Sequence, residues 1–512
     1  MGLEPARDLE KRRDAQPDGD AESPVRTTAG RTVWSGKKSL LLATGAVIAS
    51  SAMLFWGTGL HPLWWLTWLA LLPVLLVASR LGSWGAFVAA ALAWFLGSLN
   101  MWHYMLTNFA TLPVVAVFSA VPAGFFGLAV LLVRRFITRG AFWKAALAFP
   151  ATWVTLEYIN NIASPNGTFP NMGYTQMDFL PVVQMTSVVG IWGISFCLFL
   201  LPATIAALFS RQGSPRGRAR LALATAAFFA ATLGFGVWRL ASTPAPRHSV
   251  KVGLMATGID TPFARDDGGA LQLLRNYSEK ARDLAAQGAE IIVLPEKIAL
   301  VSDQATSQVD ALYAAASVQT KSTLLVGIDR GSLIKRLNEA RLYSPDRTAP
   351  AVYDKHHMVP GFEDVDQAGT TITVLNRRSG IWGIEICKDM DFPRLSRDYG
   401  AKSVGLLLVP AWDFTLDGWL HGRMAVLRGV ESGFTIVRAA KQGIMSVSDD
   451  RGRIVAEQDA AAVHFASLVT IAPVRHDDTL YARWGDWFAW LNIAALMVLL
   501  LSRSPKRQPR PA

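Results

Sequence analysis

Long apolar runs constrain this chain more than any other feature of its sequence. A helix needs roughly 20 predominantly apolar residues to cross the hydrocarbon of a bilayer, and the chain contains several runs of about that length. Seven come first, near residues 39–56, 60–79, 83–105, 111–133, 141–159, 181–209 and 220–240. One more lies near 486–502. The pattern predicts a multi-span α-helical membrane domain with about eight transmembrane helices, seven of them within residues 39–241.

Composition supports a membrane location for much of the chain. Of 512 residues, 51% are hydrophobic and only 17% are charged, whereas about a quarter of the residues of an ordinary soluble domain are charged. The mean hydropathy is +0.27. The net charge of +11 does not indicate nucleic-acid binding, because the basic residues stand in short runs beside apolar segments, as the positive-inside rule describes.

The distribution of Lys and Arg predicts the orientation. If the spans alternate, the basic clusters all fall on one side of the membrane: Lys11, Arg12, Arg13, Lys37 and Lys38; Arg80; Arg134, Arg135, Arg139 and Lys144; Arg211, Arg216, Arg218 and Arg220; and Arg503, Lys506, Arg507 and Arg510. The opposite loops, near 57–59, 106–110 and 160–180, contain neither residue type. Segment 242–485 therefore belongs on the extracytoplasmic side. The polar ends, 1–38 and 503–512, are predicted to be cytoplasmic tails, the first of them disordered.

Segment 242–485 has the pattern of an α/β domain, because short aliphatic runs alternate with amphipathic helical ones. The predicted strands are Val250–Met255, Glu290–Leu294, Thr323–Ile328, Gly380–Cys387 and Ser403–Val409. Apolar residues at helical spacing predict helices through Leu271 to Leu284, Val309 to Ala316 and Leu416 to Leu427. Asp449-Asp450-Arg451-Gly452 predicts a hairpin turn.

The two cysteines argue against a disulfide, because Cys197 lies in an apolar run and Cys387 in a mixed polar region. Cys and His do not cluster at the spacing of a zinc site. His356 and His357 are adjacent, so on a strand they would point to opposite faces. No metal site is predicted.

Three short signatures follow one another in this domain: Ile292-Val293-Leu294-Pro295-Glu296; Tyr353-Asp354-Lys355 followed by Val359-Pro360-Gly361-Phe362-Glu363; and Gly383-Ile384-Glu385-Ile386-Cys387-Lys388-Asp389. Their order resembles the Glu-Lys-Cys triad of the nitrilase, or carbon-nitrogen hydrolase, superfamily. The resemblance implies an αββα sandwich.

A thiol is poorly ionised near neutral pH, so a cysteine nucleophile needs a neighbouring base and a positive field. The resemblance makes Glu296 the base and makes Lys355 the group that lowers the thiol pKa. Lys355 would also hold the oxyanion, together with the backbone N–H of Lys388. Glu363 would orient Lys355 or share its proton. Glu385 is an alternative base, because it stands two positions before Cys387 and would share its strand face; the family pattern favours Glu296.

The spans on both sides of this domain resemble the apolipoprotein N-acyltransferase family. Its membrane motifs are matched by Glu157, Phe169-Pro170, Gly173-Tyr174-Thr175-Gln176 and Val189 to Phe196. The resemblance implies a bacterial cytoplasmic (inner) membrane enzyme without a diffusible cofactor. It implies transfer of a fatty acyl group from a phospholipid, through a cysteine thioester, to the N-terminal amine of a diacylglyceryl-lipoprotein or lipopeptide.

Three further residues are predicted to bind substrate. Glu157 is a carboxylate near the end of an apolar helix, a setting in which ionisable groups are usually functional. Phe362 and Trp412 stand near the predicted site and could form a lid or lie in the membrane interface.

The chain departs from the family pattern near the nucleophile. Lys388-Asp389 replaces the usual Tyr-Glu, Gly361-Phe362 reverses a Phe-Gly pair, and the stretch 409–414 differs from Asn-Asp-Ala-Trp-Phe. An Arg-x-x-Asn-x-Gly stretch appears with lysine at position 441. Two alternatives therefore stay open. A membrane-anchored amidase would pass the acyl group to water or to another amine, and a catalytically silent scaffold would only bind lipid or lipopeptide.

Overall fold

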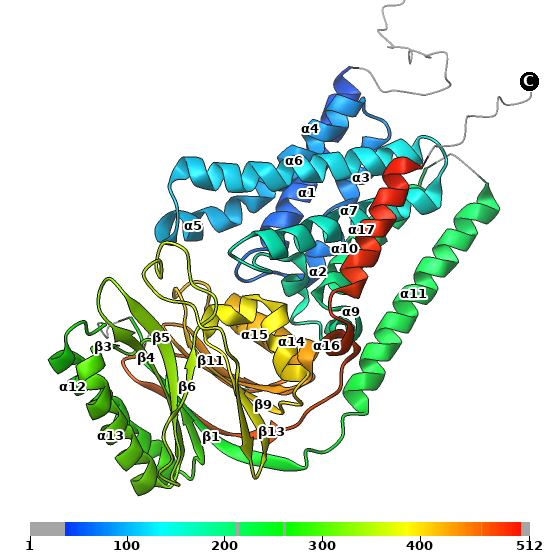
Figure 1. The fold of residues 1–512 in the computed structure, drawn as a ribbon. Coiled ribbons are helices and arrows are strands. Elements are labelled where there is room, and N and C mark those ends of the chain that lie inside the picture. The colour runs from blue at the N-terminus through cyan, green and yellow to red at the C-terminus, as the bar shows by residue number, and fades with distance from the viewer. Residues whose placement is uncertain (1–35, 211–213, 260–262, 462, 503–512) are drawn as a thin grey trace, which may run out of the picture.

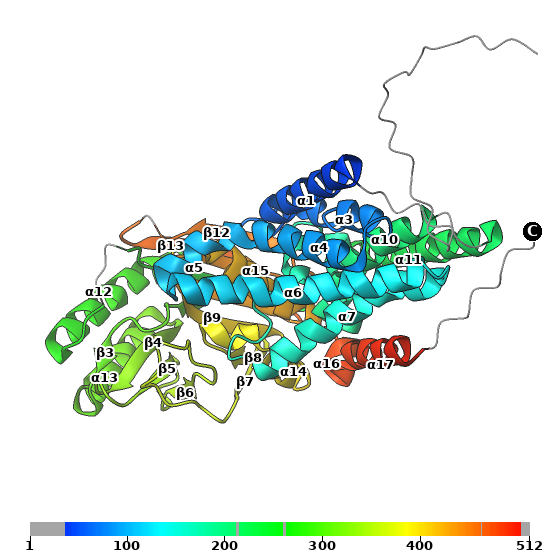
Figure 2. The same cartoon turned by 90° about the horizontal axis from the view of Figure 1, so that it is seen from above.

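The computed structural model describes residues 36–210, 214–259, 263–461 and 463–502. Nearly all of the two predicted tails lies outside these residues. The described chain has two parts, a bundle of helices and an α/β part built around two sheets (Figure 1). Seen from above, part of the helical bundle lies in front of the α/β part (Figure 2).

Five helical segments of the described residues are long and apolar enough to cross a membrane. They are α1 (Lys37–Gly57), Ser83–Asn108, α6 (Leu112–Ile137), α10 (Ile191–Leu208) and α11 (Pro215–Ala241). The second of these combines α4 (Ser83–Gly97), the 3-10 helix η1 (Ser98–Met101) and α5 (Trp102–Asn108). The prediction of several membrane helices is confirmed; the count of eight stays a prediction.

The remaining predicted spans are shorter, broken or more polar. The run near 60–79 forms α2 (Trp64–Thr67) and α3 (Leu72–Ala78), with a proline in the first turn of α3. The run near 181–209 begins with α8 (Leu180–Val183) and α9 (Thr186–Val189), and Gly190 with φ +66° separates them from α10. The other two are α7 (Phe142–Ala163) and α17 (Trp487–Leu501). Proline and a left-handed glycine end helices locally even where average hydropathy stays high.

Two sheets form the α/β part. The strands of the first are β1 (His248–Ala256), β2 (Ile291–Val293), β3 (Leu300–Val301), β4 (Thr323–Gly331), β5 (Arg336–Tyr343), β6 (Ala351–Asp354) and β13 (Ala466–Val474). Their order is β13-β1-β2-β4-β5-β6, with β3 paired to β4. The second has the order β12-β11-β10-β9-β8-β7. Its strands are β7 (Thr373–Arg377), β8 (Gly380–Ile384), β9 (Leu406–Trp412), β10 (Thr435–Lys441), β11 (Ile444–Ser448) and β12 (Ile454–Asp459).

The sheets pack face to face with helices outside them. Their shared core contains Leu254, Val293, Ile384 and Leu408, each fully buried. The helices α12 (Asp267–Ala286) and α13 (Asp303–Thr320) cover the outer face of the first sheet, and α14 (Pro393–Gly400) and α15 (Gly418–Ser432) cover that of the second (Figure 1). The predicted α/β sandwich is confirmed, as is the hairpin turn between β11 and β12.

Two local predictions need correction. The strand predicted to run to Cys387 ends at Ile384, and Cys387 begins the 3-10 helix η3 (Cys387–Asp391). The helix predicted from Leu416 begins at Gly418. In both places a turn that the apolar spacing does not reveal interrupts the regular element.

The second sheet faces the helical bundle through α15, and side chains and backbone groups join the two parts. The Thr168 amide donates to the carbonyl of Asp391 at 2.9 Å. The amide of Ile191, at the start of α10, donates to the Glu431 carboxylate at 2.7 Å. The short helix α16 (Leu480–Trp484) then leads into α17. These contacts fix the α/β part against one end of the bundle.

Candidate active site

Three buried side chains from separate segments meet beside the end of β2. Glu296 follows β2, Lys355 follows β6, and Glu363 lies in the loop after it; all are at most 4% exposed. The ammonium of Lys355 lies 2.8 Å from Glu296 Oε1 and 2.7 Å from Glu363 Oε2. The structure thus brings together the carboxylates and the lysine that the signatures predict.

The charges of this cluster stabilise one another. Burial alone lowers the pKa of Lys355, but the carboxylates of Glu296 and Glu363 raise it well above its usual range. Burial alone raises the pKa of Glu363, but Lys355 and Lys297 lower it well below its usual range. Near neutral pH the charged forms of both groups are therefore favoured, with Lys355 protonated and Glu363 ionised.

Further hydrogen bonds hold the two glutamates in place. The amide of Asn338, on β5, donates to Glu296 Oε1 at 2.6 Å and to Glu363 Oε1 at 2.9 Å. The ammonium of Lys297 lies 2.8 Å from Glu363 Oε1, and the backbone amide of Val359 donates to Glu363 Oε2 at 2.7 Å. Three donors besides Lys355 therefore hold the carboxylate of Glu363 in place.

Cys387 stands at a sharp turn where β8 gives way to η3. Its φ of +46° is uncommon for a residue with a side chain, and such strained positions cluster at functional sites. The half-buried thiol donates to the carbonyl of Trp412 at 3.5 Å. Burial and the charge of Glu296 raise the thiol pKa well above its usual range, against the opposing charge of Lys355. The charge of Lys355 thus acts in the predicted direction, lowering the thiol pKa, but burial and the charge of Glu296 outweigh it.

Asp389 links the cysteine turn to the lysine segment. Its carboxylate accepts from the amide of Ile386 at 3.1 Å and from the amides of His356 and His357 at 3.1 and 2.9 Å. The phenol of Tyr353 donates to it at 2.7 Å. Because Ile386 precedes Cys387 and His356 follows Lys355, this carboxylate fixes the two segments relative to each other.

Glu385, the alternative base, has a different hydrogen-bond partner. Its carboxylate is fully buried and accepts from the hydroxyl of Ser396 at 3.1 Å. Burial and Asp389 raise its pKa well above the usual range. The strand ends before Glu385, so the face that it was predicted to share with Cys387 does not exist. Of the two glutamates, Glu296 is the one that forms an ion pair with Lys355.

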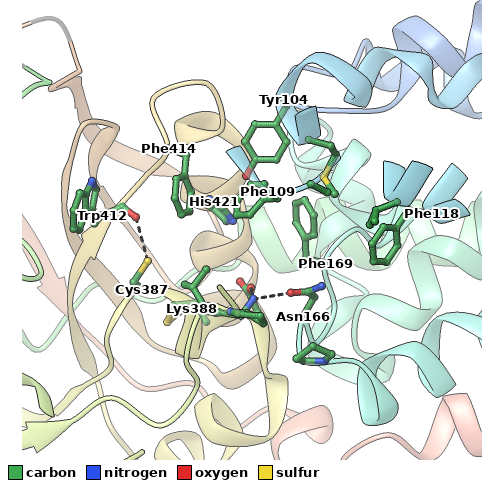
Figure 3. Close-up of a pocket in the computed structure, with 18 of the residues that line it drawn as sticks. Tyr104, Phe109, Phe118, Asn166, Phe169, Cys387, Lys388, Trp412, Phe414 and His421 are labelled. Carbon is green, nitrogen blue, oxygen red and sulfur yellow. Dashed lines mark hydrogen bonds and ion pairs between the residues drawn. The ribbon is translucent and has the colours of Figure 1, made fainter. Parts of the chain in front are cut away.

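A cavity of about 280 Å³ connects Cys387 to the membrane helices (Figure 3). Its apolar wall comes from α5, from α6 and from the turn between them: Met105, Phe109, Ala110, Val114 and Phe118. Val114 and Phe118 also belong to the exposed apolar surface of α6. The catalytic side of the cavity is lined by Cys387, Lys388, Trp412, Phe414, His421 and Arg438.

Polar groups at this junction come from both parts of the protein. The Lys388 ammonium lies 3.2 Å from Asn166 Oδ1, in the loop after α7, and 3.3 Å from Asp391 Oδ2. Figure 3 shows Lys388 and Asn166 meeting across the cavity. Lys388, a departure from the pattern of the family that the sequence resembles, thus connects the turn at Cys387 to the membrane part.

A second polar cluster contains Asp413, Asp417 and His421, whose ligand atoms lie within 4.8 Å of one another, as a metal site would require. Their charges already have partners. Arg438 forms a two-pronged ion pair with Asp413. His421 lies 3.0 Å from Asp417, which also accepts from the Tyr104 phenol at 2.5 Å. Asp417 raises the pKa of His421 to about 9 against the lowering effect of burial. Protein cations therefore neutralise these carboxylates without a metal ion.

The three predicted substrate-binding residues occupy different places. Phe362 is 46% exposed and packs on Phe414. The ring of Phe109, in the membrane part, packs on both, with its centroid 5.6 Å from that of Phe362 and 4.9 Å from that of Phe414. Trp412 lines the cavity beside the thiol. Glu157 is absent from the cavity lining among the described residues and instead accepts from the Met172 amide at 2.9 Å. Its binding role stays a prediction without support from this geometry.

The fold and the site together define a membrane protein that carries a carbon-nitrogen hydrolase domain. Residues 252–473 match that family, and residues 50–204 match the apolipoprotein N-acyltransferase N-terminal domain. An apolipoprotein N-acyltransferase of Geobacter metallireducens is 28% identical over 90% of this chain and 94% of its own. One of Bradyrhizobium diazoefficiens is 28% identical over 79% of this chain and 81% of its own. The chain belongs to the apolipoprotein N-acyltransferase family.

Similarity to solved structures is weak. An amidase from Nesterenkonia sp. AN1 is 20% identical, with a TM-score of 0.40 over 48% of this chain and 98% of its own.

Proposed function

We propose that this protein transfers a fatty acyl group from a phospholipid to the N-terminal amine of a diacylglyceryl-lipoprotein, through a thioester on Cys387. The observation that carries the proposal is the cavity at the thiol. One wall contains the cysteine and its polar neighbours, and the other is an apolar surface of α5 and α6. A thiol that opens toward membrane helices suits acyl donors and acceptors that are themselves lipids. The similarity to apolipoprotein N-acyltransferases of Geobacter metallireducens and Bradyrhizobium diazoefficiens supports the same activity.

We further propose eight spans, with the α/β domain of residues 242–485 on the periplasmic side of the inner membrane. Two loops without Lys or Arg contact that domain: Phe109 packs on Phe414, and Thr168 bonds to Asp391. The opposite end of the bundle carries basic residues. There the Arg134 guanidinium donates to the carbonyls of Ala78 and Leu81 at 2.9 and 2.8 Å. This separation agrees with the positive-inside rule.

The first half-reaction acylates the cysteine. As the sulfur attacks the ester carbonyl, Glu296 takes the thiol proton, so the thiolate forms only in the reacting complex. Lys355 and the backbone N–H of Lys388 stabilise the negative oxygen of the tetrahedral intermediate. When that intermediate collapses, the ester C–O bond breaks and Glu296 returns the proton to the departing lysophospholipid oxygen. The product is the acyl-thioester enzyme.

The second half-reaction transfers the acyl group. The neutral amine attacks the thioester carbon, Glu296 accepts a proton from the attacking nitrogen, and the C–S bond breaks. The proton then returns to the sulfur, which restores the thiol. Glu363 keeps Lys355 in place throughout, because its own carboxylate stays ionised. No diffusible cofactor takes part in this proposal.

The two cysteines provide a matched test. The full-length protein in detergent would be incubated with a phospholipid carrying a labelled acyl chain, and the adduct located by peptide mass spectrometry. We expect an acyl adduct in wild type and in Cys197→Ala, whose thiol is fully buried in α10, and none in Cys387→Ala. A diacylated lipopeptide should then discharge the adduct and become N-acylated.

The same experiment separates the alternatives. An adduct that yields only free fatty acid, with the lipopeptide unchanged, would favour a membrane-anchored hydrolase. Absence of any adduct on a folded protein would favour a silent lipid-binding scaffold. Either result would reject the proposed transfer.

A further inference from the structure

A buried lysine that the proposed reaction does not use lies behind the active site. Lys441 is the last residue of β10 and is only 6% exposed. In the parallel pairing of β10 with β9 it stands opposite Trp412. Lys441 is not among the described residues that line the cavity. Its ammonium group therefore lies outside the wall of this cavity.

This ammonium joins the two segments that carry the reacting groups. On one side it donates to the carbonyl of Lys297 at 2.5 Å. Lys297 directly follows Glu296, and its φ of +45° is unfavourable for a residue with a side chain. On the other side the ammonium lies 3.5 Å from the centre of the Trp412 ring, a cation–π distance. The carbonyl of Trp412 accepts the hydrogen bond of the Cys387 thiol.

The surroundings of Lys441 also couple its charge to the thiol. The charged and titratable groups that act on it are Glu296 and Lys297 after β2, Asp329 on β4 and Cys387 at η3. Burial lowers the pKa of Lys441 to about 7, although the negative charges of Glu296 and Asp329 and a thiolate at Cys387 would raise it. Attraction between two charges is mutual, so the protonated lysine favours the thiolate to the same extent.

We propose that Lys441 is a positioning residue that holds the Glu296 segment and the Trp412 carbonyl at a fixed separation and, when protonated, favours the thiolate of Cys387. This inference rests on the proposed function, because it assigns the roles of base and nucleophile to Glu296 and Cys387. It also gives a role to a residue at which the chain differs from the Arg-x-x-Asn-x-Gly stretch of the family that the sequence resembles. An asparagine can donate to a carbonyl but supplies neither the positive charge nor the reach of a lysine.

The test measures the thiol itself and needs no lipid. The full-length protein in detergent would be treated with iodoacetamide across pH 6 to 10, and alkylation of Cys387 would be followed by peptide mass spectrometry. We expect Lys441→Asn to alkylate about tenfold more slowly at pH 6, where Lys441 of the wild type is protonated; this corresponds to a thiol pKa about one unit higher. Lys441→Arg, which stays charged, should alkylate at least as fast as wild type above pH 8. The exposed Lys402→Asn is the control.

Acylation by phospholipid then distinguishes positioning from binding. Because Lys441 does not line the cavity, we expect Lys441→Asn to lower kcat about tenfold with little change in KM for the lipid. Asp329, whose pKa burial raises to about 7, interacts with Lys441, so Lys441→Arg, which keeps a positive charge beside it, is the reference for Lys441→Asn.

The outcomes separate this inference from the proposed function. If a folded Lys441→Asn has the alkylation profile of wild type, the positioning role is wrong. If Lys441→Asn does not fold, Lys441→Arg decides: a folded arginine variant that alkylates more slowly than wild type above pH 8 overturns the proposal. If Lys441→Asn has an altered alkylation profile but wild type forms no acyl adduct, the proposed acyl transfer is rejected and the role of Lys441 stands.

Discussion

Replacing Glu363 by glutamine tests whether the buried charge cluster is organised as described. The carboxylate is 4% exposed and accepts from Lys355 at 2.7 Å, Lys297 at 2.8 Å, Asn338 at 2.9 Å and Val359 at 2.7 Å. A glutamine keeps the shape but has one acceptor oxygen, so its amide group would face two of these four donors. Breaking a buried ion pair by removing one partner costs about 3–5 kcal/mol.

That loss is large enough to measure. For a domain of about 150–250 residues, 1 kcal/mol corresponds to roughly 2–4 °C in Tm, so we expect Glu363→Gln to melt about 6–20 °C lower at pH 7. The melting would be followed by tryptophan fluorescence of the full-length protein in detergent. Glu457→Gln is the control, because its pair with Arg423 at 2.8 Å is 40% exposed on the glutamate side. Such an exposed pair contributes at most about 1 kcal/mol.

The pH dependence has a definite sign. The folded-state pKa of Glu363 lies below its unfolded value, because the effect of Lys355 and Lys297 exceeds that of burial. The stabilisation is therefore complete above the unfolded pKa of about 4.3 and is lost as the pH falls toward the lowered one. The difference in Tm between wild type and Glu363→Gln should be full at pH 7 and smaller at pH 3. If the glutamine variant melts like Glu457→Gln at pH 7, the cluster does not contribute as argued.

Two further predictions concern the groups beside this cluster. Asp389→Ala should slow acylation of Cys387 by roughly 100-fold or more, because the buried carboxylate accepts from Ile386, His356 and Tyr353 and its removal leaves buried donors without a partner; an unchanged single-turnover rate would contradict this. The raised pKa of His421, about 9, implies stabilisation that is complete below pH 6.5 and lost as the pH rises through 9. The Tm of wild type should therefore fall over that pH window by more than the Tm of His421→Gln. If the two Tm values fall in parallel, the ion pair of His421 with Asp417 contributes little.

Sequence patterns predicted those parts of the site that local chemistry determines. Glu296 follows the aliphatic strand β2 and Lys355 follows the short strand β6, and their order with Cys387 indicated one site before any contact was known. Hydropathy also located the apolar helices, because the requirement for about 20 apolar residues is local. The break between α2 and α3 was missed, since an average over the run hides the effect of Pro73.

What the sequence did not predict depends on contacts between distant segments. Asp389 stood inside a quoted signature, yet nothing local indicates that its carboxylate accepts from amides of His356 and His357. Lys441 was noticed only as a departure from a pattern, and its place between Lys297 and Trp412 follows from the pairing of β10 with β9. The turn at Cys387 was predicted as strand, because the spacing of Ile384 and Ile386 fits a strand up to the nucleophile.

The position of the cavity bears on the choice between transfer and hydrolysis. Any thioester enzyme must keep water from the acyl group until the intended acceptor arrives. Here the residues opposite Cys387 include Phe109 and Phe118 of the membrane part, and Phe362 and Phe414 pack around Phe109 at the rim. An acyl chain bound between these rings would shield the thioester, while an acceptor held in the same membrane could still reach it by lateral diffusion. The helices that anchor the catalytic domain therefore also form a wall of its site, so we infer that the membrane part favours an amine carried on a lipid over water.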